Sequence, residues 1–172
     1  MKLETVSKDI LNWIKNTVEV PRDQLNGRSV CPFAQQSRLN NTFEIRIGTD
    51  VRSDLERIMD KGLEHKEVVI LVYAPDQYSA QDFDFEVTSA NADILGPHDL
   101  IALSDHPDDL EEIQGIVVNQ GQYALIFVQQ LSKLNQASHV LAKQGFYRGW
   151  SSEYLRDLFR FRKAPEQLEI DL

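Results

Sequence analysis

The chain has 172 residues, of which 42% are hydrophobic and 26% charged, which is enough to bury the core of one globular domain. Its formal net charge of −9 argues against nucleic acid and anionic membrane surfaces as partners, because both bind through basic patches. The single cysteine excludes an internal disulfide and a multi-cysteine zinc site, and it fits a reducing cytoplasm. The longest apolar run, residues 68–74, is too short to span a bilayer, and the first residues lack the apolar core of a signal peptide. We therefore expect a cytoplasmic protein with one globular domain over residues 1–163 and a C-terminal tail over 164–172.

In chain order, the first predicted element is an amphipathic helix over residues 4–19, where apolar side chains recur every three or four residues. Residues 43–47 alternate between apolar and charged side chains, which is typical of a half-buried strand. A second helix is expected next, with Thr49 or Asp50 as its N-cap and Gly62 as its stop.

Residues 68–73 are apolar on both faces, which predicts a central strand. The following helix has Ser79 as its N-cap and ends at Gly96, and a short third strand is expected over residues 99–103. This alternation predicts an α/β or α+β fold. We expect a small sheet of three to four strands, mixed or parallel, with crossover helices and a helical C-terminal part.

The second half of the chain is less regular. Residues 104–120 are polar and predict irregular structure. Residues 123–134 are compatible with a strand or a helix, and the spacing of Phe127, Leu131 and Leu134 favours a helix. Further helices are expected over residues 135–144 and 151–162.

Cys31 is the first candidate functional residue. Pro32 suits the first turn of a helix, which would place the thiol beside free backbone N–H groups at the helix N-terminus. Such a position favours the thiolate, which can attack an electrophile or bind a soft metal, including haem iron. The alternative is a buried structural cysteine, because free cysteine is among the most buried residue types.

His106 and Asn119 are the other candidate catalytic residues. His106 follows the third predicted strand, in a loop position where open α/β sheets place ligands, and it could act as a general base or proton relay. The alternative is a histidine solvated among acidic neighbours. With Cys31, the pair supplies the residue types of a thiol-protease triad. Arg148 or Arg156 could bind a carboxylate or a haem propionate, or belong to a solvated basic face.

Five segments together resemble the bacterial domain-of-unknown-function family 1415. They are a first helix bearing Trp13, the Cys-Pro-Phe-Ala motif within residues 30–34, and the segments 81–84, 105–107 and 119–124. The match is divergent, since an aspartate stands where the family has phenylalanine before the histidine. The family implies no settled activity.

Cys31 with Phe33 also resembles the Pro-Cys-x-Phe element of the YqcI/YcgG family, which includes small haem-dependent N-hydroxylases. This resemblance implies that the Cys31 thiolate ligates haem iron, the arrangement that favours O–O cleavage. The pocket would then include Phe33 and other aromatic residues, with Phe83, Phe127 and Trp150 as candidates.

The leading hypothesis is thus a small-molecule enzyme of bacterial metabolism centred on Cys31, a haem-thiolate oxygenase or peroxidase with haem as cofactor. A second hypothesis is a cofactor-free enzyme with Cys31 as nucleophile, His106 as base and Asn119 as orienter, acting on an acyl-type electrophile. The third is a non-catalytic binding or scaffold protein. The expected partner is a small molecule, and homodimerisation is left open.

Overall fold

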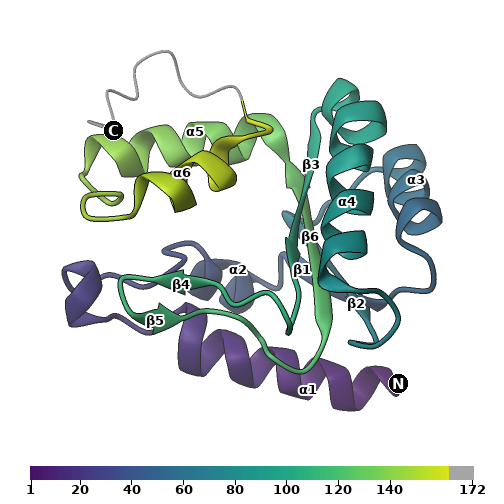
Figure 1. Ribbon diagram of the computed structural model, residues 1–172, viewed down its shortest axis with the longest axis horizontal. Coiled ribbons are helices and arrows are strands. Elements are labelled where there is room, and N and C mark those ends of the chain that lie inside the picture. Colours follow the sequence, from purple (N-terminus) through teal and green to yellow (C-terminus); the bar gives the residue numbers. More distant parts are fainter. Residues whose placement is uncertain (163–172) are drawn as a thin grey trace.

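The computed structural model describes residues 1–162, and its centre is a mixed sheet with the strand order β1-β2-β6-β3 (Figure 1). The strands are β1 (Phe43–Ile47), β2 (Val68–Tyr73), β6 (Ala124–Gln130) and β3 (Leu100–Asp105). β1 and β2 are parallel, whereas β6 is antiparallel to both β2 and β3. Strands β1, β2 and β3 therefore run in one direction, and we call the side of the sheet where they end the carboxyl edge. The α/β fold and the mixed sheet are confirmed.

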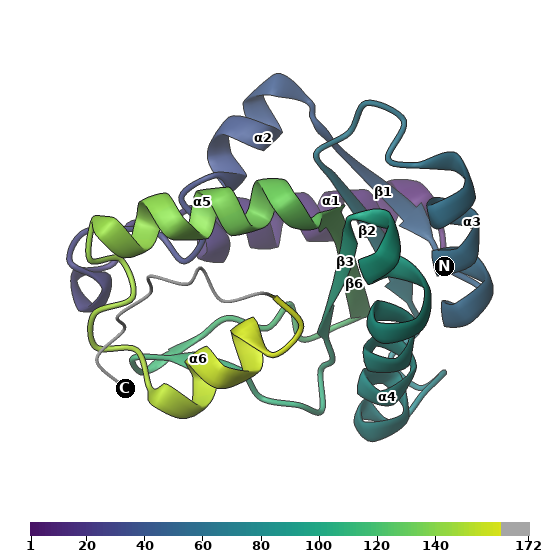
Figure 2. The same ribbon diagram turned by 90° about the horizontal axis from the view of Figure 1, so that it is seen from above.

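Helices cover both faces of the sheet. They are α1 (Leu3–Trp13), α2 (Ala34–Asn40), α3 (Val51–Lys61), α4 (Ala80–Ala90), α5 (Leu131–Lys143) and α6 (Ser152–Phe159). Figures 1 and 2 show α3 and α4 on one side of the sheet and α1, α2, α5 and α6 on the other. None of the helices among residues 1–162 has the length and apolar character needed to cross a bilayer.

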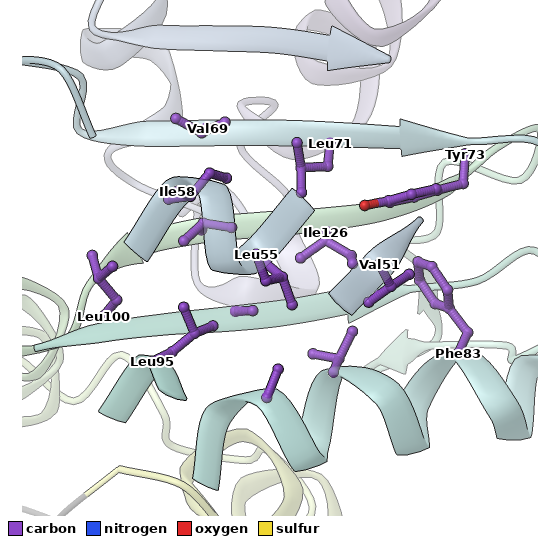
Figure 3. Packing of buried hydrophobic residues seen from close by; sticks show 14 of the residues in the cluster. Val51, Leu55, Ile58, Val69, Leu71, Tyr73, Phe83, Leu95, Leu100 and Ile126 are labelled. Atoms are coloured by element: carbon purple, nitrogen blue, oxygen red, sulfur yellow. The ribbon is translucent and has the colours of Figure 1, made fainter. Parts of the chain in front are cut away.

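Strand β2 is a continuous apolar run because helices pack on both faces of the sheet at this strand. Val69, Leu71 and Tyr73 pack with α3 and α4, whereas Ile70 and Val72 pack with α1. The side chains of successive residues point to opposite faces, so both sets are buried. Figure 3 shows the α3–α4 cluster, in which Tyr73 lies beside Phe83 at the carboxyl edge.

The local helix signals are confirmed. The Asp50 carboxylate accepts a hydrogen bond from the backbone N–H of Ser53, and the Ser79 hydroxyl accepts one from Asp82. The first predicted helix is present as α1, followed by a π-helical turn over Ile14–Val18.

The preference for a helix over residues 123–134 is wrong in its first part. Residues up to Gln130 form β6, and α5 begins only at Leu131. β6 pairs with a neighbour on each side, so the ladder hydrogen bonds of two strands stabilise it. The helical spacing of Phe127 and Leu131 is accidental, because the two residues lie in different elements.

A short hairpin interrupts the stretch predicted to be irregular. Strands β4 (Glu112–Ile113) and β5 (Ile116–Val117) pair antiparallel, and both residues of the connecting turn, Gln114 and Gly115, have positive φ. Its buried residues contact Leu25 near the N-terminus and Tyr154 on α6. We call the group formed by α5, residues 144–151 and α6 the C-terminal lobe. The hairpin therefore connects the loop around Leu25 to this lobe. The predicted tail, residues 164–172, lies outside the described residues.

Candidate functional site

The carboxyl edge is built around a buried tyrosine. The Tyr73 hydroxyl donates a hydrogen bond to the Asp54 carboxylate (3.2 Å), which also accepts one from the backbone N–H of Thr49 (2.7 Å). Gly48 lies against the Tyr73 ring, and a Cβ atom at this position would lie 2.2 Å from the nearest ring atom. These contacts fix the end of β1 against the start of α3. The Tyr73 hydroxyl and the Asp54 carboxylate are therefore engaged in hydrogen bonds within the fold.

His106 also lies at this edge, and it is buried, so the alternative of a solvated histidine is wrong. Its Nδ1 accepts a hydrogen bond from the backbone N–H of Asp108 (3.2 Å), so Nε2 carries the hydrogen that it donates to the carbonyl of Tyr78 (3.2 Å). Its ring packs 5.7 Å from Phe83. With both nitrogens engaged, the geometry favours a structural role over a general base.

We therefore expect His106→Ala to destabilise the protein by about 2 kcal/mol, since it leaves the Tyr78 carbonyl and the Asp108 N–H without partners. The measurement is urea denaturation followed by circular dichroism. The exposed His98 provides a matched control, and His98→Ala should shift stability by less than about 0.5 kcal/mol. Equal effects of the two substitutions would contradict the structural role.

Asn119 holds the loop after β3 in place. Its side-chain amide donates to Asp105 Oδ1 (2.8 Å) and to the carbonyl of Asp109 (2.7 Å), and its Oδ1 accepts from the backbone N–H of Glu111 (2.6 Å). Its contact with His106 is to the backbone carbonyl, at 3.3 Å, and not to the ring. Asn119 and His106 are thus brought together, but not as orienter and base. Cys31 is not among their hydrogen-bonding partners in the part of the chain that the structure describes.

The same loop carries two carboxyl groups with altered acidity. Burial raises the pKa of Asp105, although Asn119 and the backbone N–H of Gln120 oppose the shift. Burial, followed by the nearby charges of Asp105 and Asp109, raises the pKa of Glu111 to about 7. Sequence reasoning missed Glu111. The dense acidic run from Asp105 to Glu112 was the available signal, but it does not reveal which member is desolvated.

Cys31 precedes α2 and does not begin it. Ala34 is the first residue of the helix and Phe33 its N-cap. Hydrogen bonds from the backbone of Phe33 and Ala34 lower the pKa of the Cys31 thiol, but desolvation of the sulfur is larger and raises it above its ordinary value. The expectation of a stabilised thiolate is therefore wrong in direction, although the residue as a whole is only half-buried.

Cys31 is linked to the C-terminal lobe through its neighbour Val30, which packs on the same hydrophobic cluster as Trp150 and Tyr154. Burial raises the pKa of Tyr147, whose ring belongs to the lobe's aromatic cluster, and a charge on the Cys31 sulfur would add to this shift. The same tyrosine interacts with the Arg162 guanidinium and the Ser138 hydroxyl, both of which are buried. Arg162 Nη1 donates a hydrogen bond to Ser138 Oγ (2.9 Å), and the guanidinium stacks 5.1 Å from the centre of the Phe159 ring. These polar groups form what we call the lobe site: Cys31, Ser138, Tyr147 and Arg162.

Of the residues predicted for haem, Trp150 lies in the aromatic cluster of the C-terminal lobe, but the others do not converge on Cys31. Phe33 is 47% exposed, and Arg148 and Arg156 are exposed. Phe83 and Phe127 pack on opposite faces of the sheet. The residues present do not fit a haem at Cys31, and haem ligation stays a prediction without geometric support. Within residues 1–162, no group of three histidine, cysteine or acidic side chains is placed to hold a metal ion.

An open groove of about 410 Å³ lies elsewhere, between α4 and the residue that follows α6. Arg160 bridges it through Asp84 (2.7 Å) and Thr88 (2.8 Å). Arg160 and Asp84 already neutralise one another, so this groove has less uncompensated charge with which to bind a charged ligand than the lobe site.

Comparisons with protein families, characterised proteins and solved structures found no match to this chain. The resemblances based on the Cys-Pro-Phe-Ala motif therefore stay predictions, and the function has to be argued from the geometry.

Proposed function

We propose that this protein binds a small organic molecule at the lobe site, with the Cys31 thiol at its border. The observation that supports this proposal is the burial of Ser138, Tyr147 and Arg162 among aromatic and aliphatic side chains. Small-molecule sites in proteins have this composition, with mostly apolar walls and a few polar groups that orient the ligand. Buried polar groups are also costly to the fold, which makes a role in binding a reasonable explanation of their presence.

The raised pKa of Cys31 argues for binding rather than nucleophilic catalysis. At neutral pH the sulfur is a thiol, which attacks electrophiles far more slowly than a thiolate. The predicted base, His106, has both ring nitrogens engaged in hydrogen bonds to the backbone.

A second candidate function is proton transfer by Glu111. Its pKa of about 7 matches that of an effective general acid or base at physiological pH. Burial, followed by the charge of Glu111, raises the pKa of Tyr154, which connects Glu111 electrostatically to the C-terminal lobe. Chemical conversion of a ligand bound in the C-terminal lobe would support this candidate. Binding without conversion would support the first proposal.

The pH dependence of Cys31 alkylation tests the site. We expect iodoacetamide to react with the folded protein slowly at pH 7, with the rate rising through an apparent pKa above 9.0, because desolvation raises the thiol pKa. A ligand in the lobe should slow this reaction, so we would screen benzamide and phenylacetamide, two uncharged aromatic probes, for protection at pH 9. The rate is measured by mass spectrometry of the modified peptide.

Two results would contradict the proposal. Alkylation with an apparent pKa below 8 would restore Cys31 as a poised nucleophile. Reaction that occurs only after denaturation would show that the thiol does not border an accessible site.

A further inference from the structure

Arg162 is an unusual residue for the interior of a lobe. Only 7% of its surface is exposed, and its guanidinium lies among aromatic side chains. A buried charge costs several kcal/mol unless an opposite charge compensates it. No ion pair links Arg162 to a carboxylate among residues 1–162, where its polar neighbours are Ser138 and the two tyrosines, Tyr147 and Tyr154.

Among residues 1–162, the Ser138 hydroxyl is the one hydrogen-bond partner of the Arg162 guanidinium. Nη1 is held by the Ser138 hydroxyl at 2.9 Å. Nε is buried and has no hydrogen-bond partner among the described residues. The N–H groups of Nε and Nη2 are parallel in a planar guanidinium, and this edge binds the two oxygens of a carboxylate side by side. Ser138 therefore orients the group through Nη1, which does not belong to the Nε–Nη2 edge that recognises carboxylates.

The surroundings of Arg162 suggest the rest of the ligand. Phe146, Tyr147, Trp150 and Phe159 form a connected aromatic cluster, with ring centres 5.1–5.5 Å apart. An apolar or aromatic body would replace water against these side chains. A negatively charged ligand would also offset the free-energy cost of burying the Arg162 guanidinium.

We infer that the ligand of the lobe site is an organic carboxylate with an apolar or aromatic body, its carboxylate bound by the Nε–Nη2 edge of Arg162. This inference rests on the proposed binding function and names the class of ligand.

The test compares acids with their uncharged amides. Benzoate and phenylacetate are titrated against the full chain at pH 7.5 by calorimetry, next to benzamide and phenylacetamide, which have the same shape without the charge. We expect each acid to bind roughly tenfold or more tightly than its amide, as a charged pair of hydrogen bonds implies. Arg162→Met should reduce the acids to the affinity of the amides. Arg162→Lys, which keeps the charge and loses the planar fork, should recover part of the difference.

Arg156→Met is the matched control, because Arg156 is an exposed arginine of α6, and it should leave all affinities unchanged. If Arg162→Met fails to fold, Arg162→Lys and Ser138→Ala still test the inference, since both should weaken acid binding and spare amide binding. Acids and amides that bind equally well would overturn the inference and leave the proposed function standing. If none of the four probes binds or protects Cys31, the proposed function fails, and the inference with it.

A carboxylate of the chain itself is the alternative ligand to test, and the sequence after Arg162 contains Glu166, Glu169 and Asp171. A variant with Glu166→Gln, Glu169→Gln and Asp171→Asn separates the two cases. Equal acid affinity in this variant and in the natural chain supports an external ligand. Acid binding that arises only in the variant would overturn the inference.

Discussion

Gly48→Ala is expected to destabilise the protein by about 3 kcal/mol or more, because an added Cβ meets a closer neighbour here than at any other glycine of the chain. A Cβ at this position would lie 2.2 Å from Cε1 and 2.3 Å from Cζ of Tyr73, well inside van der Waals contact. The ring cannot retreat, because Tyr73 is fully buried and packs between Tyr78 and Phe83. Gly48 is also held in place, since its N–H donates to the carbonyl of Val72 (2.9 Å).

A double-mutant cycle checks this explanation by urea denaturation. Tyr73→Leu will be destabilising by itself, but in its background Gly48→Ala should cost less than about 1 kcal/mol, because the opposing ring is gone. A Gly48→Ala variant with nearly natural stability would contradict the expected clash. So would an equal cost of the substitution in both backgrounds.

Glu111→Gln is expected to stabilise the protein at alkaline pH by up to about 3 kcal/mol, since each unit of pKa difference is worth roughly 1.4 kcal/mol. The folded protein raises the pKa of Glu111 from 4.5 to about 7, so between these values the folded state binds more protons than the unfolded state. Stability therefore falls as the pH rises. The contribution of the protonated group is fully present below about pH 4.5 and is lost as the pH rises through about 7. Glutamine resembles the protonated form and does not ionise.

Free energies of unfolding at pH 5, 7 and 9 provide the measurement. The difference between Glu111→Gln and the natural chain should be smallest at pH 5 and should grow toward pH 9. Asp105, whose pKa is also raised, contributes to the slope in the same direction in both proteins. Because the charges of Asp105 and Glu111 interact, the difference between the two profiles includes this coupling. The exposed neighbour provides a control, and Glu112→Gln should leave the profile unchanged. Parallel profiles for the natural chain and Glu111→Gln would show that Glu111 ionises normally.

The sequence by itself was sufficient for the features that depend on neighbouring residues. The apolar spacing of the first helix, the N-caps Asp50 and Ser79, and the continuous apolar run of β2 predicted elements that the structure contains. These signals are local, because a cap bonds a backbone N–H three residues away and a strand alternates with period two. The α/β class followed from the order of these elements.

Tertiary structure alone decided the features that depend on distant segments. Residues 124–130 became a strand because β2 and β3 pair with it on both sides, and no local pattern reports such pairing. The sequence drew attention to Cys31, yet its pKa depends on desolvation by the fold around it. Burial of Arg162 likewise depends on α5 and on the aromatic cluster, and nothing in the sequence around it distinguishes it from the exposed Arg156. The physical reason is the same in each case: sequence patterns specify which face of an element is apolar, whereas burial and acidity are set by whichever segments cover that face.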